Sequence, residues 1–487
     1  MTTSSTATPL TLHEDRVFDS DPTVRRVART IYEGTRALPL ICPHGHVDPR
    51  WLADNAPFPE PSSLLVTPDH YVTRMLYSQG VPLEALGVRP LGTQARDDGA
   101  LANDPRRIWR TFAAHVGLFR ATPSGYWLDH ELHDVFGIRV ALNSATADYV
   151  YDAIAERLQS AEFRPRSLFE RFNIDVLATT DAATDSLTSH AALRASGWTG
   201  RVIPTFRPDQ LFAITSPSWR DAVDVLAAQS QMRIDSVAAL VDALAVRRTV
   251  FAAAGATATD HGVQDAYTAQ LTDDACDAIW QRAMDGRATA ADQRALTAHL
   301  LMEMARQSVD DGLVMQLHAG SYRNHNVPLF DRFGPDIGAD IPIAAEFTRN
   351  LQPLLNAYGN SPALTLLLFT LDESTYAREL APLAGHYPAV RLGPAWWFHD
   401  SISGMTRYRE WTTETAGIWN TAGFNDDTRA FCSIPARHDL SRRVDANVLA
   451  RLVARHLIDL SDAHGMARAM AYDLARTTYK LEGLTTA

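Results

Sequence analysis

Two histidines separated by one glycine, His44 and His46, are the first residues of this chain whose types and spacing suggest chemistry. In an extended chain, residues i and i+2 point to the same side, so two imidazoles placed in this way can bind one metal ion. Histidines that only face solvent are the commoner case for a bare His-x-His pair. Here an apolar run from Leu38 precedes the pair and the turn signal Asp48-Pro49 follows it, which favours metal binding. A catalytic zinc or similar ion needs further ligands and an open position, so we expect a carboxylate or another histidine from elsewhere.

The apolar run before the histidines is one of eight strand-like segments along the chain. Continuous apolar strands that alternate with helices indicate a buried parallel sheet, and eight such units predict a (β/α)8 barrel. An open doubly wound sheet is the alternative, but no Gly-x-Gly-x-x-Gly turn follows an early strand. The expected strands are the opening run, residues 175–180, 201–206, 312–318, 363–370 and 390–397, and two weaker candidates, 256–261 and 422–427.

We expect a single domain over residues 1–487, a distorted barrel that carries two large helical insertions. The first insertion, after strand 1, spans about residues 60–172 and is rich in aromatic side chains. The second, after strand 4, spans about residues 265–308, where Ala and Leu favour helix. Within the first insertion, residues 68–80 predict a helix with Asp69 near its start.

Polar residues recur at or just beyond the carboxyl ends of the expected strands. A barrel of this kind gathers those ends on one face, which is where its chemistry lies. One such residue is most often a satisfied structural group, but so many at strand ends would be an unlikely accident, so the set predicts an active site. Its members are His44, His46, Thr180, Asp181, Arg207, Asp260, His261, His318, residues 396–400, Asp427 and Arg429.

The composition is that of an ordinary soluble globular protein, with 46% hydrophobic and 21% charged residues. We expect a cytoplasmic protein with no membrane partner, because no run of eighteen apolar residues occurs and the first eight residues lack the regions of a signal peptide. The three cysteines form no Cys-x-x-Cys pair, which argues against a disulfide framework or a thiolate zinc site. A net charge of −12 argues against a nucleic-acid partner and requires local arginines for any anionic ligand. The oligomeric state stays open, a homo-oligomer included.

Several short motifs follow one another in a fixed order from about residue 25 to 480. They are His44-Gly-His46, Asp69-His-Tyr-Val-Thr-Arg74, Ala178-Thr-Thr-Asp181 with Asp185-Ser-Leu, Pro204-Thr-Phe-Arg-Pro-Asp209, Asp260-His-Gly262, Met315-Gln-Leu-His318 with Arg323-Asn324, Gly393-Pro-Ala-Trp-Trp-Phe398, and Asp427-Thr-Arg429 with Arg437-His438. Each motif is weak alone, but in this order they resemble the uronate isomerase (glucuronate isomerase) family of the amidohydrolase superfamily.

The resemblance implies a distorted (β/α)8 barrel that binds one divalent metal ion, usually Zn²⁺. It also implies interconversion of D-glucuronate with D-fructuronate and of D-galacturonate with D-tagaturonate, so that the partner is a small anionic sugar. The chain departs from the family pattern at three places, which bear on the preferred uronate. Cys42-Pro43 precedes the histidines and Gly45 separates them, Phe206 replaces an expected tryptophan, and the sequence Asn425-Asp-Asp-Thr-Arg429 replaces a simpler one.

Converting an aldose to a ketose moves a proton between adjacent carbons, so the site needs a base, an acid and groups that hold the oxygens. A metal ion on His44, His46 and Asp427 would hold substrate oxygens, and the Asp-x-Arg spacing selects Asp427 over its neighbour Asp426. For the substrate carboxylate, the strand-end candidates are Arg207 and Arg429. A surface ion pair is the alternative for either arginine.

The resemblance makes Tyr71 the residue that shuttles the proton, with His70 beside it, although Asp427 could serve instead. A tyrosine near a cation should exchange its proton more easily than a free one. The alternative is that Tyr71 packs its ring against the helical insertion. His318 is expected to contact substrate, or else to be a core histidine, and Trp396 is expected in the pocket wall against the substrate. The roles of Asp260 and His261 stay open.

Two other functions are compatible with the motifs. One is a metal-dependent hydrolase of the same superfamily, in which a lysine carbamate at the end of the fourth strand often bridges two metals. No lysine stands there, and the position carries Asp260-His261. The other is a silent carbohydrate-binding relative, which should have lost Asp427, Tyr71 or a metal histidine, and all of these are present.

Overall fold

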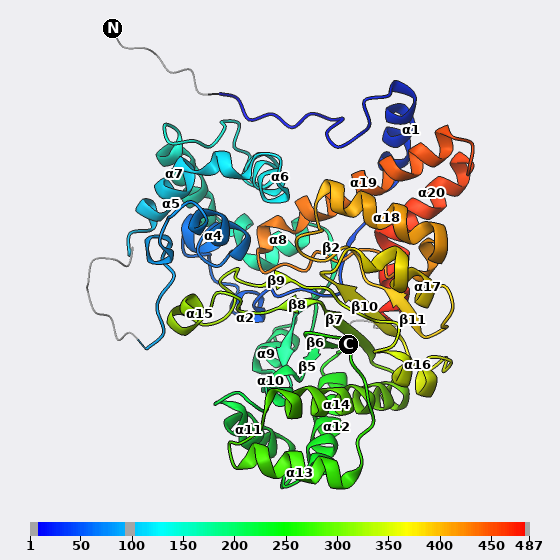
Figure 1. The fold of residues 1–487 in the computed structure, drawn as a ribbon. Coiled ribbons are helices and arrows are strands. Elements are labelled where there is room, and N and C mark those ends of the chain that lie inside the picture. The colour runs from blue at the N-terminus through cyan, green and yellow to red at the C-terminus, as the bar shows by residue number, and fades with distance from the viewer. Residues whose placement is uncertain (1–7, 93–102, 483–487) are drawn as a thin grey trace.

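The structure of this protein is a computed structural model that describes residues 8–92 and 103–482. Residues 1–7 lie outside the described residues; they belong to the N-terminal stretch that lacks the regions of a signal peptide. Residues 93–102 of the first predicted insertion also lie outside the described residues. Figure 1 shows a central set of strands with a helical lobe on either side and a third group of helices above it. Among the described residues, no helix is both long and apolar enough to cross a lipid bilayer.

The strands at the centre pair in parallel, as the apolar runs predict. A three-stranded sheet has the order β1-β2-β4 and a six-stranded sheet the order β11-β10-β7-β6-β5-β3. The two sheets are continuous, because the N–H of Thr179 donates to Ile203 O at 2.9 Å and that of Asp181 to Thr205 O at 3.0 Å. The strands are β1 Leu40–Cys42, β2 Ile174–Ala178, β3 Asp181–Ala182, β4 Arg201–Ile203, β5 Phe206–Arg207, β6 Ala258–Gly262, β7 Val314–Ala319, β10 Leu366–Thr370 and β11 Val390–Leu392.

The segment 421–428 closes the ring between the first and last strands. Thr421 forms a parallel bridge with Leu392, and the N–H of Ala422 donates to Leu392 O at 2.8 Å. At the other end of the segment, the N–H of His46 donates to Thr428 O at 3.0 Å. The eight predicted units therefore form a distorted (β/α)8 barrel, which confirms the predicted fold class.

The last two predicted strands differ most from the structure in their extent. Residues 422–427 do not form a regular strand, because Asp427 has a φ of 38°, which is left-handed rather than extended. The strand predicted over 390–397 ends at Leu392 in β11. Pro394 follows two residues later and has no N–H to continue the ladder.

A helical lobe fills the sequence between β1 and β2 and forms the blue-to-cyan side of Figure 1. Its buried aromatic side chains include Trp109, Phe112 and Phe119. The helix predicted over 68–80 is α4, which begins at His70 because the Asp69 carboxylate accepts the N–H of Tyr71 at 2.8 Å. The helices are α2 Pro49–Asp54, α3 Pro61–Leu65, α4 His70–Tyr77, α5 Pro105–Ala114, α6 Pro123–His130, α7 Ala147–Leu158 and α8 Pro165–Arg171.

A second helical lobe lies on the opposite side of the strands and is green in Figure 1. The region predicted over 265–308 contains α13 Asp273–Met284 and most of α14 Ala290–Asp311, which lie between β6 and β7. Both helices contact α12 Val237–Ala253, which precedes β6. With α10 Asp209–Phe212 and α11 Trp219–Ser230, this lobe therefore draws on the connections before and after the fourth barrel strand.

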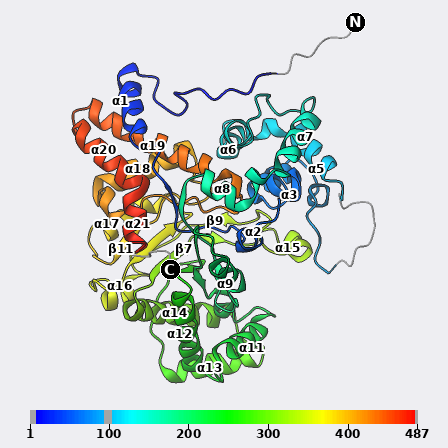
Figure 2. The same cartoon turned by 180° about the vertical axis from the view of Figure 1, so that it is seen from behind.

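The remaining elements cover the barrel between these lobes. The hairpin of β8 and β9 and helix α15 follow β7, and Figure 2 shows the C-terminal helices beside α1 on one flank. These elements are α1 Pro22–Glu33, α9 Thr188–Ala195, β8 Ser321–Tyr322, α15 Val327–Phe333, β9 Ile341–Pro342, α16 Gln352–Tyr358, α17 Ala381–Ala384, α18 Ile402–Ala416, α19 Ile434–Ala454, α20 Leu460–Arg468 and α21 Leu474–Thr478.

Candidate active site at the mouth of the barrel

His44, His46 and Asp427 meet where β1 ends beside the closing segment. Oδ1 of Asp427 lies 3.4 Å from Nε2 of His44 and 3.2 Å from Nε2 of His46. The hydrogen bond between His46 N and Thr428 O holds the two backbones together at this point. Asp427 therefore faces both histidines, whereas the neighbouring Asp426 faces a different pair of side chains.

These three side chains fit a divalent metal ion. Their donor atoms, two imidazole nitrogens and a carboxylate oxygen, lie within 4.8 Å of one another, and Nδ1 of His44 is buried without a hydrogen-bond partner among the described residues. Burial opposes the charge of Asp427, but the two imidazoles outweigh it and hold the pKa of that carboxyl well below its usual range. An ionised carboxylate beside two imidazoles is a donor set that suits zinc.

His318 lies behind this cluster rather than in the cavity wall. Its ring stacks on those of His44 and Phe369, with centroids 4.8 Å and 4.1 Å away. Oδ1 of Asp260 lies 2.7 Å from Nδ1 of His318, so the carboxylate accepts the proton of that nitrogen. Nε2 of His318 is buried and has no hydrogen-bond partner among the described residues. Asp260 therefore orients His318 and leaves Nε2 as an acceptor.

A cavity of about 670 Å³ opens in front of the cluster. Most of the residues predicted to bind metal or substrate or to transfer a proton line it; His44 and His318 do not, because they are 2% and 3% exposed and lie behind its wall. Thr180, Asp181, Asp260 and His261 of the wider strand-end set also lie outside its lining. The predicted residues in the wall are His46, His70, Tyr71, Arg207, Trp396, Asp427 and Arg429. The structure thus brings together residues that are far apart in sequence.

Tyr71 is held by a buried carboxylate that we did not single out from the sequence. Its hydroxyl donates to Oδ2 of Asp400 at 2.7 Å, and Nη1 of Arg437 lies 3.3 Å from the same oxygen. Burial and the charge of Asp400 raise the pKa of Tyr71 well above its usual value. This direction is the opposite of the one we predicted, because burial and the anionic partner Asp400 both favour the neutral phenol. Burial also raises the pKa of Asp400 to about 6.

His70 lies beside Tyr71, as expected, with ring centroids 5.1 Å apart. The edge of its ring also meets Trp397, and its Nδ1 is buried without a hydrogen-bond partner among the described residues. Burial and the charge of Arg429 lower the pKa of His70 to about 3. The imidazole of His70 is therefore neutral near pH 7, so no imidazolium is present there to act as a general acid.

The two arginines predicted to hold a carboxylate differ in their surroundings. Nε of Arg207 lies 2.7 Å from Oδ2 of Asp209, and its Nη1 lies 3.3 Å from Oδ2 of Asp260. Arg429, with 30% of its side chain exposed, has one longer contact of 3.7 Å to Asp336. Because Arg207 is already paired with two carboxylates, Arg429 is the more available group for an anionic ligand.

Three other residues of the cavity wall, Arg323, Asp336 and Arg437, were given no role from the sequence. Arg323 and Asp336 belong to the excursion after β7, and Nη1 of Arg323 lies 3.1 Å from Asp340. Arg437 comes from α19, where its guanidinium lies 3.6 Å from the centre of the Trp127 ring. Asp400 belongs to the predicted strand-end set and Arg437 to the last motif. Their positions in the sequence did not indicate that they lie beside Tyr71.

Comparisons with known proteins agree with this site. The glucuronate isomerase family matches residues 19–479. A uronate isomerase of Rhizorhabdus wittichii is 55% identical over 476 residues, which cover 98% of this chain and 100% of the relative. The crystal structure of glucuronate isomerase from Caulobacter crescentus is 50% identical and superposes with a TM-score of 0.95 over 98% of each chain. The uronate isomerase structure from Thermotoga maritima, at 23% identity, shares the fold with a TM-score of 0.89 and covers 96% of this chain and 99% of its own. This chain therefore belongs to the glucuronate isomerase family and is an isomerase.

Proposed function

We propose that this enzyme interconverts D-glucuronate with D-fructuronate and D-galacturonate with D-tagaturonate, using one divalent metal ion, most simply Zn²⁺. The observation that carries this proposal is the cavity in which the His44, His46 and Asp427 cluster faces both Tyr71 and Arg429. Such a site offers a position for two adjacent sugar oxygens, a proton-transfer group and a cation for the carboxylate. Its volume of about 670 Å³ accommodates a single hexuronate.

The metal ion, when bound by His44, His46 and Asp427, supplies a positive charge for the oxygens on C1 and C2. Arg429 binds the carboxylate at the other end of the substrate, because its guanidinium is exposed to the cavity and has only the 3.7 Å contact with Asp336. His318 supports the site from behind the cavity wall, where its ring stacks on that of His44 with centroids 4.8 Å apart. Trp396 forms part of the wall against which the sugar lies. Arg207 is already paired with Asp209 and Asp260, so we assign the substrate carboxylate to Arg429 rather than to Arg207.

The hydrogen bond between Tyr71 and Asp400 provides a route for the proton. As Oη of Tyr71 takes the proton from C2 of the open-chain aldose, its own proton passes over the 2.7 Å contact to Oδ2 of Asp400. Tyr71 then gives a proton to C1 while Asp400 returns the one that it holds, and the hydroxyl proton of O2 moves to O1. Arg437, 3.3 Å from Asp400, holds the carboxylate in place throughout. Asp400 is suited to this exchange because its pKa of about 6 lies close to neutral pH.

A binuclear hydrolase is the less favoured function. The chain has one lysine, Lys480, whose ammonium donates to Gly312 O at 2.6 Å, before the start of β7 and away from the carboxyl ends of the strands. No lysine is therefore available at the end of β6 to carry a bridging carbamate.

An assay of ketose formation tests the proposal. Purified enzyme is given D-glucuronate or D-galacturonate, with and without a chelator, and the neutral sugars D-glucose and D-galactose serve as matched controls without the carboxylate. We expect turnover of a uronate, loss of turnover with chelator and no comparable turnover of the neutral sugars. Equal activity on uronates and neutral sugars, or activity on neither uronate with metal present, would contradict the proposal.

A further inference from the structure

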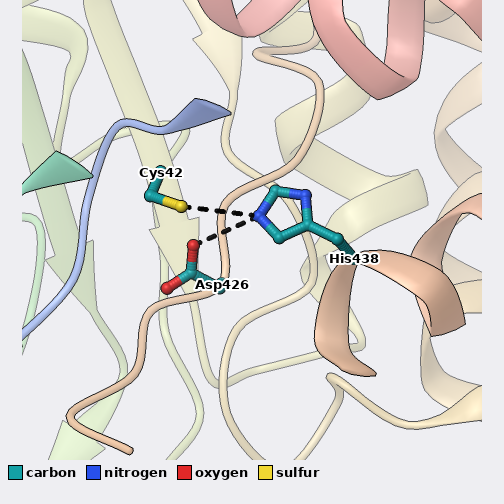
Figure 3. A group of neighbouring side chains, drawn as sticks. All are labelled: Cys42, Asp426 and His438. Atoms are coloured by element: carbon teal, nitrogen blue, oxygen red, sulfur yellow. Dashed lines mark hydrogen bonds and ion pairs between the residues drawn. The ribbon is translucent and has the colours of Figure 1, made fainter. Parts of the chain in front are cut away.

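A second group of metal-ligating side chains lies beside the first and takes no part in the mechanism. Cys42, Asp426 and His438 come from β1, the closing segment and α19, and Figure 3 shows the three side chains pointing toward one another. They are 1%, 4% and 2% exposed. We propose that these three residues form a second, buried site for a divalent ion that prefers sulfur and nitrogen ligands, such as Zn²⁺.

The distances in this group fit the ligands of one ion as well as they fit hydrogen bonds. Nε2 of His438 lies 3.7 Å from Sγ of Cys42 and 3.2 Å from Oδ2 of Asp426. Ligands at tetrahedral zinc distances are separated by roughly 3.6 Å for sulfur and nitrogen and roughly 3.3 Å for nitrogen and oxygen. An imidazole hydrogen bond to a carboxylate is usually shorter, at about 2.7–2.9 Å when charged. One nitrogen also cannot donate its single proton fully to both neighbours.

A bound cation would also pair with the buried side chain of Asp426. Its side chain is buried, and among the described residues no arginine or lysine forms an ion pair with it. Arg437 binds the backbone carbonyl of Asp426, and Arg442 donates to the carbonyls of Arg36 and Pro39. A buried carboxylate without a permanent cation is costly, whereas a thiolate and a carboxylate together balance one divalent ion.

Of the three proposed ligands, His438 borders a groove on the side of the barrel opposite the active site. His438 lines a groove of about 540 Å³ together with Leu40 and Asn173, which stand at the amino ends of β1 and β2. Arginines including Arg442 and Arg443 line the same groove and repel cations. We therefore expect the ion to enter during folding and to exchange slowly afterwards. The sequence did not predict this site, because its ligands come from three separate segments.

Cobalt substitution tests the proposal without relying on activity. The full chain is produced in medium supplied with Co²⁺, and its near-ultraviolet absorption is recorded for thiolate-to-cobalt charge transfer. The active-site cluster has no sulfur ligand, and among the described residues the second cluster is the one candidate ligand group that contains a cysteine. Cys42→Ser removes the ligand, and Cys276→Ser, at a buried thiol in α13, is the matched control.

We expect the charge-transfer absorption in the wild type and in Cys276→Ser, and its loss in Cys42→Ser. We also expect zinc-loaded protein to fall from about two equivalents of metal per chain to about one in Cys42→Ser. A wild-type cobalt protein without thiolate absorption would overturn the proposal, even if Cys42→Ser failed to fold. So would absorption that survives in a folded Cys42→Ser protein. Hexuronate turnover is measured separately, so either result leaves the test of the isomerase function intact.

Discussion

Two walls of the same cavity are built in different ways. On one wall, His46 and Asp427 stand where β1 ends beside the closing segment of the barrel. On the other, Tyr71 from α4 of the first helical lobe meets Asp400 and Arg437, which come from the far end of the chain. The barrel wall holds charged ligands around one point, whereas the helical wall holds a protonated phenol on a buried carboxylate. This difference suggests that metal binding and proton transfer can be lost separately.

The largest effect should follow from removing a metal-binding side chain of the barrel wall. We expect His46→Ala to lose the active-site ion and to reduce hexuronate turnover to background, because two ligands hold an ion much less firmly than three. The measurements are metal content per chain and ketose formation, with His456→Ala at an exposed position as the control. Metal content equal to that of the wild type would show that these residues are not the ligands.

Removing the Tyr71 hydroxyl from the helical wall should slow the proton transfer while the metal ion stays bound. We expect Tyr71→Phe to lower kcat by about 10²–10⁴-fold, the range for loss of a general acid or base. Metal content should not change, because Tyr71 contacts Asp400 rather than the histidine cluster. A folded Tyr71→Phe enzyme that turns over at the wild-type rate would assign the proton transfer to Asp427 or to another group.

A third change tests what holds the substrate between the two walls. We expect Arg429→Met to lower kcat/KM for a uronate, because it removes a charged contact to the carboxylate. The decrease should correspond to a loss of about 2–5 kcal/mol of transition-state binding free energy. Arg233→Met, at a side chain that is 87% exposed, is the control and should have no comparable effect. If Arg429→Met retains the wild-type preference for uronates over neutral sugars, Arg207 or Arg323 must bind the carboxylate instead.

The smallest expected effect is a change in pH dependence. The carboxylate form of Asp400 accepts the proton of Tyr71, and the pKa of Asp400 is raised to about 6. That form predominates above pH 6 and is lost below it, so we expect kcat/KM to fall as the pH drops below about 6. Asp400→Asn cannot titrate and should lack this acid limb, with a lower plateau. A profile of the same shape in Asp400→Asn would exclude Asp400 as the group that titrates.

The sequence by itself determined the barrel and the residues at its strand ends. Apolar runs of strand length repeat with helices between them, and burial on both faces leaves a parallel sheet as the arrangement that satisfies them. The i, i+2 spacing of His44 and His46 follows from the geometry of an extended chain, which is a local property. The Asp-x-Arg spacing likewise selected Asp427, which the structure places 3.2 Å from His46.

The tertiary structure alone decided the electrostatics of the helical wall and the second cluster. The pKa of Tyr71 depends on burial and on Asp400, 329 residues away in sequence, and no local pattern encodes that contact. The adjacent residues Asp426 and Asp427 join different clusters, which the order of the residues alone does not show. Such contacts arise only when several segments pack together, because burial and charge act through space rather than along the chain.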